Sequence, residues 1–181
     1  MLNKVKIAVD AMGGKGSPKK IIEGIEISLK SNQENFFYLY GKKDLLEQEI
    51  SKRKVLQKYC EIINTEDIVL DDESALTGAK KSKNSSMWKA VESLREKNSD
   101  ISLSAGNTGA LLVISRLLLK TIAGISKPAL AGLWPNQNSM NVVLDLGANI
   151  ECTEKNLTDF ACMGSALYKS LFANDKPKIA L

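Results

Sequence analysis

The sequence predicts an α/β fold, in which a three-layer, mostly parallel sheet carries helices on both of its faces. Apolar strand-like runs alternate with amphipathic helical stretches, as they do where helices connect parallel strands. Hydrophobic residues make up 44% and charged residues 25% of the 181 residues, which is enough apolar material for the core of one medium domain. Small-residue turns follow several of the apolar runs.

Seven short apolar runs are predicted to be strands. The first is VKIAVDA, and the run ISLSAG leads directly into a glycine turn. Two later runs, PALAGLWP and NVVLDLG, are apolar throughout and predict buried strands. The last run, KPKIAL, predicts one more strand. The runs cover residues 5–11, 36–41, 60–65, 101–106, 128–135, 141–147 and 176–181.

Helical spacing of apolar residues fills the stretches between these runs. Ser17 is placed to cap a helix that starts at Pro18, because proline loses no hydrogen bond at the first helical position. One face of that helix carries Ile21, Ile22, Ile25 and Leu29. The stretch from Thr108 to about Lys120 is apolar on nearly all sides, which predicts a buried helix. Further helices are expected over residues 43–56, 85–97 and 153–172.

Residues 71–84, DDESALTGAKKSKN, stand out as a polar and charged stretch. It is long for a connection inside a compact domain, and such loops are usually functional or mobile. A parallel strand that begins at Pro177 would need a following helix to cover it. We therefore expect the chain to be truncated, as the N-terminal part of something longer.

Composition excludes several classes of protein. A net charge of +4 suits acidic small molecules or an acidic partner protein but is too weak to indicate nucleic acid binding. Three cysteines without a paired motif predict a reduced, intracellular protein. The chain starts without a secretory segment, and no apolar stretch approaches the ~18–20 residues that span a bilayer. We expect a cytoplasmic protein.

The sequence contains no histidine. This excludes Ser–His and Cys–His nucleophile pairs and every metal site that depends on histidine. Any chemistry must therefore use Lys, Asp, Glu, Ser, Thr, Asn, backbone amides or a reactive substrate. We expect neither a metal ion nor a cofactor.

Three small-residue turns share one predicted topology, since each lies at the carboxyl end of an apolar run just before a helix. They are DAMGGKGSP (10–18), SAGNTGA (104–110) and DLGANIE (145–151). In an open α/β sheet these strand ends share one edge, and ligands bind there. The helix that follows offers unpaired N–H donors and a partial positive charge. Three converging turns favour a site for an anionic ligand over three structural corners.

Four polar residues in these turns are candidates for chemistry. Asp10 and Asp145 could orient a hydroxyl, bind a metal or satisfy nearby backbone donors. Asn107 and Asn149 suit a carbonyl or an oxyanion, although asparagine also serves turns and caps. The residues alone leave these alternatives open.

Lys80, Lys81 and Lys83 form a basic cluster beside Ser85 and Ser86, at a predicted helix start. Such a run is commonly a solvated surface, but its position also suits a phosphate group or an acidic protein. Nearby large side chains favour packing over cofactor binding: Met87, Trp88 and Trp134.

Several motifs occur together along the chain: KIAVDAMGG…P, KK.KNSSM, SAGNTGAL, GI.KPALA, LDLGAN and FA.MGSA. In this order and spacing they resemble the PlsX family, the phosphate acyltransferases of bacterial phospholipid synthesis, over residues 6–181. The resemblance implies a fold similar to that of phosphotransacetylases and isopropylmalate dehydrogenases. Residues 1–181 would then be the N-terminal part of a single α/β acyltransferase domain.

The resemblance also implies an activity and partners. The family transfers a fatty acyl group from acyl-[acyl-carrier protein] to inorganic phosphate. The product is an acyl phosphate, which a downstream glycerol-phosphate acyltransferase uses. A homodimer is implied, in the cytoplasm and in peripheral contact with the inner face of the membrane.

The chain departs from the family pattern at a few positions. Lys15 and Gly16 stand where the family has Asp and often His, and Asn156 stands where a His is common. Lysines at positions 80 and 81 replace the usual arginines. The family also continues well beyond residue 181.

The reaction can proceed without a histidine. A thioester is already activated because a thiolate is a good leaving group, and phosphate is largely dianionic at neutral pH. The protein must hold phosphate, align the carbonyl and stabilise the oxyanion. The predicted phosphate-binding residues are Gly13, Gly14, Lys81, Lys83, Ser85, Ser86, Ser104, Gly106, Thr108, Gly109 and Gly147. The predicted catalytic residues are Asp10, Asn107, Asp145 and Asn149.

Two other functions remain open at this point. The chain could be a non-catalytic module that binds the carrier protein or a membrane interface. It could also be a phosphotransacetylase-like enzyme that acts on acyl-coenzyme A.

Overall fold

The chain divides into two compact units, and each has a sheet of its own. The computed structural model describes residues 4–81, 83–137, 139–172 and 176–181. Unit 1 is Met1–Lys120, and unit 2 is Thr121–Leu181.

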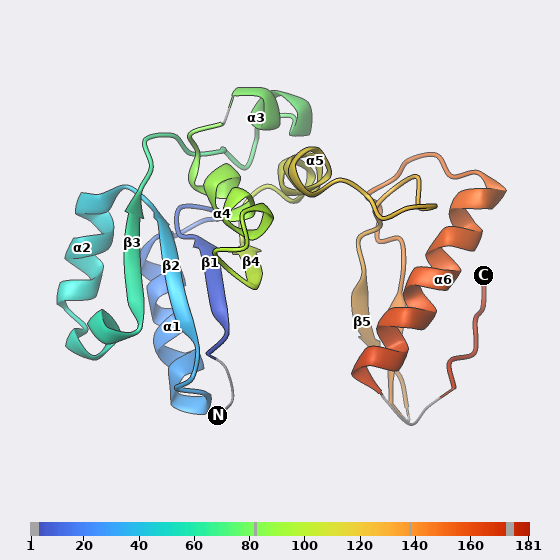
Figure 1. Cartoon of the computed structure of the whole chain (residues 1–181), viewed down its shortest axis with the longest axis horizontal. Coiled ribbons are helices and arrows are strands. Elements are labelled where there is room, and N and C mark those ends of the chain that lie inside the picture. Colours follow the sequence, from blue (N-terminus) through green and yellow to red (C-terminus); the bar gives the residue numbers. More distant parts are fainter. Residues whose placement is uncertain (1–3, 82, 138, 173–175) are drawn as a thin grey trace. The chain divides into compact units, whose positions relative to one another are not determined.

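Unit 1 is built on a four-stranded parallel sheet with the strand order β3-β2-β1-β4 (Figure 1). From β1 the chain runs outward through β2 to β3, and it then crosses to the other side of β1 to form β4. The topological switch point therefore lies between β1 and β4. The elements are β1 Lys6–Asp10, α1 Lys19–Ser31, β2 Phe36–Gly41, α2 Lys43–Ser51, the short 3₁₀ helix η1 Lys54–Lys58, β3 Cys60–Asn64, α3 Ala75–Lys81, α4 Ser86–Arg95, β4 Ile101–Ser104 and α5 Thr108–Leu119.

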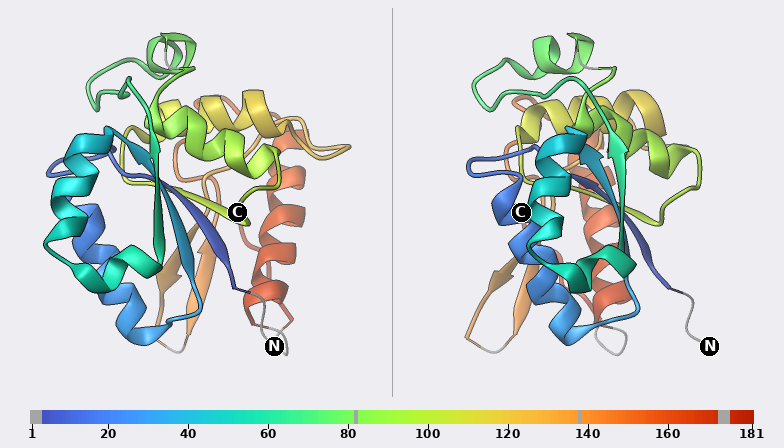
Figure 2. Two further views of the ribbon diagram at one scale, coloured as in Figure 1. Left: turned by 60° about the vertical axis from the view of Figure 1, so that its left-hand side comes forward. Right: turned by 90° about the vertical axis from the view of Figure 1, so that its left-hand side faces the viewer.

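Helices cover both faces of this sheet, because alternate residues of a strand point to opposite sides. Ile7 and Val9 of β1 pack in one cluster with buried side chains of α1 and α2. On the other face, Ala8 packs with Tyr40 and with Ala90 of α4. The helix α5 packs beside α4 (Figure 2). This arrangement confirms the predicted α/β layers.

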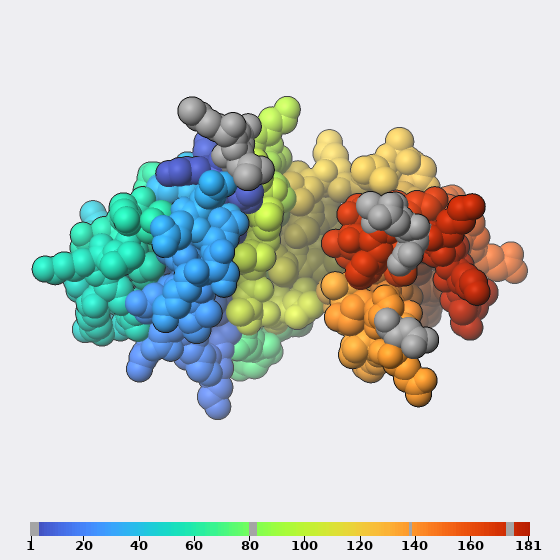
Figure 3. Space-filling model, turned by 90° about the horizontal axis from the view of Figure 1, so that it is seen from below, coloured from blue at the N-terminus to red at the C-terminus, as the bar shows by residue number. Residues whose placement is uncertain are grey.

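The two ends of the sheet differ in what surrounds them. In Figure 1 the strands of unit 1 end at the upper side of the unit, where α3 also lies. Figure 3 views unit 1 from the opposite side, where the end of α1 and η1 form the surface. The strand β4 forms one edge of the sheet, and its Ile101 and Leu103 are 44% and 49% exposed.

Two helices of unit 1 differ from the prediction. Residues 71–84 are not irregular throughout, since α3 forms inside them; Ala79 packs in the core cluster of α4 and α5. The helix α5 is buried on one face only, and Leu117 on the other face is 57% exposed. The helices α3 and α4 cover one side of α5. The apolar sequence of α5 therefore did not lead to burial on all of its sides.

The expected start of α1 and end of α2 also need correction. Ser17 does not cap α1, because its hydroxyl donates to the carbonyl of Gly13 and Pro18 occupies the N-cap position. The helix predicted over 43–56 ends at Ser51, and η1 follows it.

Unit 2 contains an antiparallel pair of strands, β5 Gly132–Pro135 and β6 Met140–Val143, and the helix α6 Glu154–Leu171. The prediction of buried strands is wrong here. Trp134 of β5 is 61% exposed, because each strand pairs only with the other. Residues 176–181, predicted to be a strand, form none.

The helix α6 confirms the helix expected after Thr153. The Thr153 hydroxyl oxygen accepts a hydrogen bond from the Asn156 amide, and the Asn156 side-chain oxygen accepts one from the Thr153 amide. This reciprocal capping box satisfies two backbone donors that the first turn would otherwise leave unpaired.

Candidate functional site

Two of the predicted glycine corners meet where β1 and β4 end. Asp10 and Ser104 are in register, and the Ser104 hydroxyl donates to Asp10 Oδ2 at 2.7 Å. Asp10 Oδ1 accepts from the amides of Gly13 (3.1 Å) and Met12 (3.3 Å). Ser104 Oγ accepts from the amide of Gly106 at 3.1 Å. We call this set of bonds the Asp10–Ser104 link; it joins both corners across the switch point.

Glycine is required where the two corners touch. A Cβ on Gly13 would lie 2.4 Å from Asp10 Oδ2 and 2.9 Å from the Gly106 nitrogen. A Cβ on Gly14 would lie 2.5 Å from the Ala105 carbonyl oxygen, and its φ of 83° disfavours other residues as well. The corners therefore approach each other through bare main chain.

Backbone donors remain available beside the link. Gly14 and Gly16 have φ values of 83° and 90° on either side of Lys15, an alternation typical of anion-binding nests. Within the described part of the chain, the amides of these three residues have no acceptor. The amides of Thr108 and Gly109 occupy the first turn of α5, where a helix provides no acceptor.

Asn107 begins α5 and ties a neighbouring segment to it. Its Oδ1 accepts from the Ala110 amide at 3.0 Å, which caps the helix. Its Nδ2 donates to the carbonyls of Leu70 (3.3 Å), Asp71 (3.4 Å) and Glu73 (2.8 Å). The side chain thus has structural partners at both ends, and its predicted contact with a substrate carbonyl stays a prediction.

The serines at the start of α4 are both buried. Ser85 Oγ accepts from the Trp88 amide at 3.1 Å and caps the helix. Ser86 is also buried, and its hydroxyl has no partner among the described residues. Lys83 is exposed in the preceding turn, whereas the side chain of Lys81 lies outside the described residues.

The third corner lies in unit 2 and forms a cluster of its own. Asp145 accepts from the amides of Leu130 (2.8 Å), Ala148 (3.2 Å) and Asn149 (2.8 Å). The Asn149 side chain donates to Asp145 and to the Pro128 carbonyl, both at 2.8 Å. Burial raises the pKa of the Asp145 carboxyl, but the hydrogen bonds that it accepts outweigh burial and hold the pKa below its ordinary value.

The prediction that all three corners end strands of one parallel sheet is wrong for this third corner. It follows β6, which belongs to the separate antiparallel pair. Gly147 supplies a φ of 87° in its turn. Asp145 and Asn149 line a cavity of about 780 Å³ within unit 2, between β6, α6 and residues 176–181.

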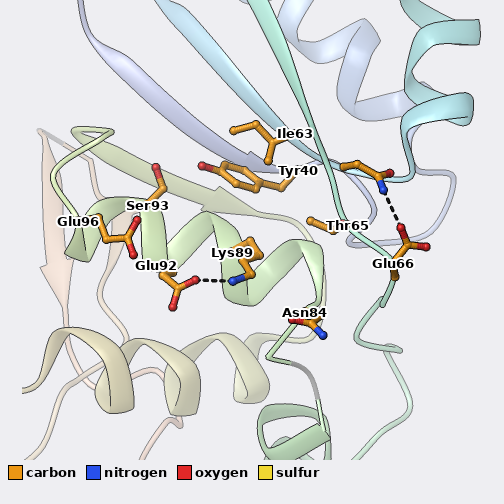
Figure 4. Close-up of a pocket in the computed structure, with 10 residues that line it drawn as sticks. Tyr40, Ile63, Thr65, Glu66, Asn84, Lys89, Glu92, Ser93 and Glu96 are labelled. Carbon is orange, nitrogen blue, oxygen red and sulfur yellow. Dashed lines mark hydrogen bonds and ion pairs between the residues drawn. The ribbon is translucent and has the colours of Figure 1, made fainter.

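Unit 1 also contains a cavity of about 550 Å³ beside β2, β3 and α4 (Figure 4). Tyr40 and Ile63 line it from the strands, and Lys89 and Glu92 of α4 form an ion pair at 2.7 Å on its wall. Burial raises the pKa of the Tyr40 hydroxyl, and a hydrogen bond with Ser93 lowers it in part. No residue of the two glycine corners lines this cavity.

Two features are absent from the described residues. No group of three or more Cys, Asp or Glu side chains is placed so that it could hold a metal ion. No helix there combines the length and the apolar character that a membrane span requires.

Sequence reasoning found both corners of unit 1 but missed the link between them. The available signal was the polar residue that closes each strand, Asp10 in β1 and Ser104 in β4. Only the pairing of β1 with β4 turns these residues into partners.

Fold and site together define an open α/β protein whose two glycine corners meet at its topological switch point. Residues 5–181 match the family described as "Fatty acid synthesis protein", and the chain belongs to that family. The match confirms the resemblance inferred from the motifs.

Proteins named phosphate acyltransferase are similar to this chain over nearly all of its length. The one from Pelagibacter ubique (strain HTCC1062) is 56% identical over 177 residues, which is 98% of this chain and 53% of the relative. That of Xanthobacter autotrophicus is 38% identical over 182 residues, which is 100% of this chain and 51% of the relative. The chain spans about half the length of the curated relatives it matches.

Proposed function

We propose that this chain supplies the phosphate-binding part of an acyltransferase that moves a fatty acyl group from acyl-[acyl-carrier protein] to inorganic phosphate. The observation that supports the proposal most is the meeting of two glycine corners between the ends of β1 and β4, beside backbone amides that have no acceptor in the described chain. The relatives named phosphate acyltransferase support the same class of reaction.

The two corners have features that a small dianion needs. The amides of Gly14, Lys15 and Gly16 are free of acceptors in the described chain and follow an alternation typical of nests. The first turn of α5 adds N–H groups and the positive end of a helix dipole. The net charge of +4 adds a general attraction.

In the proposed reaction, a phosphate oxygen attacks the thioester carbonyl, and the carrier thiolate leaves. One C–O bond forms and one C–S bond breaks, and the leaving thiolate takes up the proton that the hydrogen phosphate loses, so the products are an acyl phosphate and the free carrier thiol. Phosphate is already an anion, so the chain has to hold it and offer N–H donors to the oxyanion. Asn107 and Asn149 stay predicted as further donors to the carbonyl.

The proposal also includes partners and location. A basic surface suits the acidic carrier protein and would make the rate sensitive to salt. A homodimer, a cytoplasmic location with peripheral membrane contact, and a downstream glycerol-phosphate acyltransferase complete it. Neither a cofactor nor a metal ion nor nucleic acid takes part.

Phosphate titration followed by amide NMR tests binding. We expect inorganic phosphate to shift the amide signals of Gly14, Lys15, Gly16 and Gly109, while chloride at equal ionic strength does not. Gly16→Ala, which forces a side chain into a φ of 90°, should weaken the response, and Gly24→Ala in α1 should not. Shifts spread evenly over the chain, or none, would contradict a phosphate site here.

Turnover separates the proposed enzyme from two alternatives. The chain is incubated with acyl-[acyl-carrier protein] and phosphate, and acyl phosphate is trapped with hydroxylamine. Carrier binding without acyl phosphate would indicate a non-catalytic module, a possibility that the half-length match to the relatives raises. Faster turnover of acyl-coenzyme A than of the carrier substrate would indicate a phosphotransacetylase-like enzyme.

A further inference from the structure

We infer that Asp10 and Ser104 are positioning residues: they lock the two glycine corners into one donor surface and take no part in bond making. This inference rests on the proposed phosphate site and assigns how that site is kept in shape. It replaces the catalytic role that the sequence predicted for Asp10 and the phosphate-binding role that it predicted for Ser104.

Both members of the link already have hydrogen-bond partners within the protein. Asp10 is 1% exposed, and each of its carboxylate oxygens already accepts at least one hydrogen bond. The Ser104 hydroxyl uses its proton on Asp10 and accepts from the Gly106 amide. A general acid or base must come within hydrogen-bond reach of the substrate. A carboxylate that is enclosed in this way is placed to shape the loops.

The link determines which backbone amides of the two corners are hydrogen-bonded within the protein. It draws in the amides of Gly13 and Gly106 and leaves those of Gly14, Lys15 and Gly16 without acceptors in the described chain. The Ser104–Asp10 bond also crosses the switch point and connects residues that are 94 positions apart in the sequence. Because the amides of Gly13 and Gly106 are bonded within the protein, we infer that those of residues 14–16 are oriented toward a ligand.

The link lowers the conformational entropy that these glycine-rich loops lose when phosphate binds. Glycine loses more backbone freedom on ordering than any other residue, so a loose corner would have to be ordered when phosphate binds. A corner that is already ordered avoids this cost and binds more tightly. Gly13 and Gly106 are also in close contact, since a Cβ on Gly106 would lie 3.1 Å from Gly13 Cα. This contact restricts the movement of the two corners once the link is made.

The strand β4 offers a matched control two residues before Ser104. Ser102 is on the same strand, and its buried hydroxyl has no hydrogen-bond partner among the described residues. Ser104→Ala and Ser102→Ala remove the same group, but only the first removes bonds of the link. Ser104→Thr keeps the hydroxyl and serves as the rescue variant.

Two measurements are made on the full chain and its variants. The first is hydrogen exchange of the Gly13 and Gly106 amides without any ligand. The second is the Kd for inorganic phosphate from amide NMR at constant ionic strength. For Ser104→Ala we expect exchange to rise and Kd to rise about five- to tenfold, which is what one net hydrogen bond is worth. Ser102→Ala should change neither, and Ser104→Thr should stay close to the wild type.

Each other outcome has a definite meaning. Faster exchange with unchanged Kd would make the link merely structural and overturn the inference. Unchanged exchange in Ser104→Ala would overturn the link itself. A wild-type chain that shows no phosphate response would refute the proposed function, while the exchange data would still decide whether the link orders the corners. Should Ser104→Ala not fold, Asp10→Asn, which removes one acceptor and keeps the shape, replaces it.

Discussion

At the scale of single residues, Gly13 and Gly24 show that the effect of adding a Cβ depends on the atoms around it. A Cβ on Gly13 would overlap the link, whereas a Cβ on Gly24, in the middle of α1, would have nothing within 4 Å. The first glycine is needed for close approach. The second only adds backbone freedom to the unfolded chain.

Gly13→Ala should therefore destabilise the chain by about 1–3 kcal/mol, the usual cost of forcing extra atoms into a packed site. Gly24→Ala should stabilise it by about 0.5–1 kcal/mol, because alanine favours a helix. The free energy of unfolding of unit 1 in urea measures both. Equal effects of the two variants would contradict the close packing of the corners.

At this scale the sequence predicted the two glycine corners of unit 1, because DAMGG and SAGNTG are compositions typical of tight turns. It could not predict that Asn107 and Ser85 both act as helix caps, since an asparagine or serine before a helix suits a cap and a ligand equally well. Which of these applies depends on neighbours such as the carbonyl of Glu73, 34 residues away in sequence.

At the scale of elements, the parallel half of the fold was predictable and the hairpin was not. The first three strands alternate with helices of clear periodicity, and this pattern constrains their connections. The runs that became β5 and β6 are just as apolar, but apolar character does not reveal which partner a strand will have. Trp134 shows the result, since it lies exposed on a strand predicted to be buried.

The corner that follows β6 gives a prediction for pH. The pKa of Asp145 is lower in the folded chain than in the unfolded chain, so its bonds stabilise unit 2 above the unfolded pKa of about 3.9. This contribution should be lost as pH falls through the folded pKa. Unit 2 of the wild type should therefore exceed Asp145→Asn in stability near neutral pH, and the difference should shrink below about pH 4.

Urea unfolding followed through the amide signals of α6 measures this difference. Asn141→Asp, at an exposed position of β6, serves as a comparison because it makes the reverse exchange, from a carboxamide to a carboxylate. A difference between the wild type and Asp145→Asn that stays constant from neutral to acid pH would contradict the role of these hydrogen bonds.

At the scale of the whole molecule, the cysteines are distributed unequally between the two units. Burial raises the pKa of the Cys60 thiol to about 12, whereas Cys152 and Cys162 in unit 2 are exposed. At about pH 8 only about one Cys60 thiol in ten thousand would be ionised, and the thiolate is the reactive form.

Titration with a disulfide reagent should therefore detect two thiols in the native chain, and the third only as urea unfolds unit 1. Cys60→Ala should abolish the urea-dependent step and leave the other two unchanged. Rapid reaction of all three thiols without urea would contradict the packing of β3 against η1 and α2.

The last residue of β4, Ser104, takes part in the Asp10–Ser104 link, and the strand itself is an edge of the sheet. The backbone N–H and C=O groups of an edge strand can pair with an extended peptide. The exposed side chains of Ile101 and Leu103 add apolar surface beside them. Its length of four residues limits that tendency. We therefore expect any self-association of the chain to rise with its concentration and to involve this edge strand.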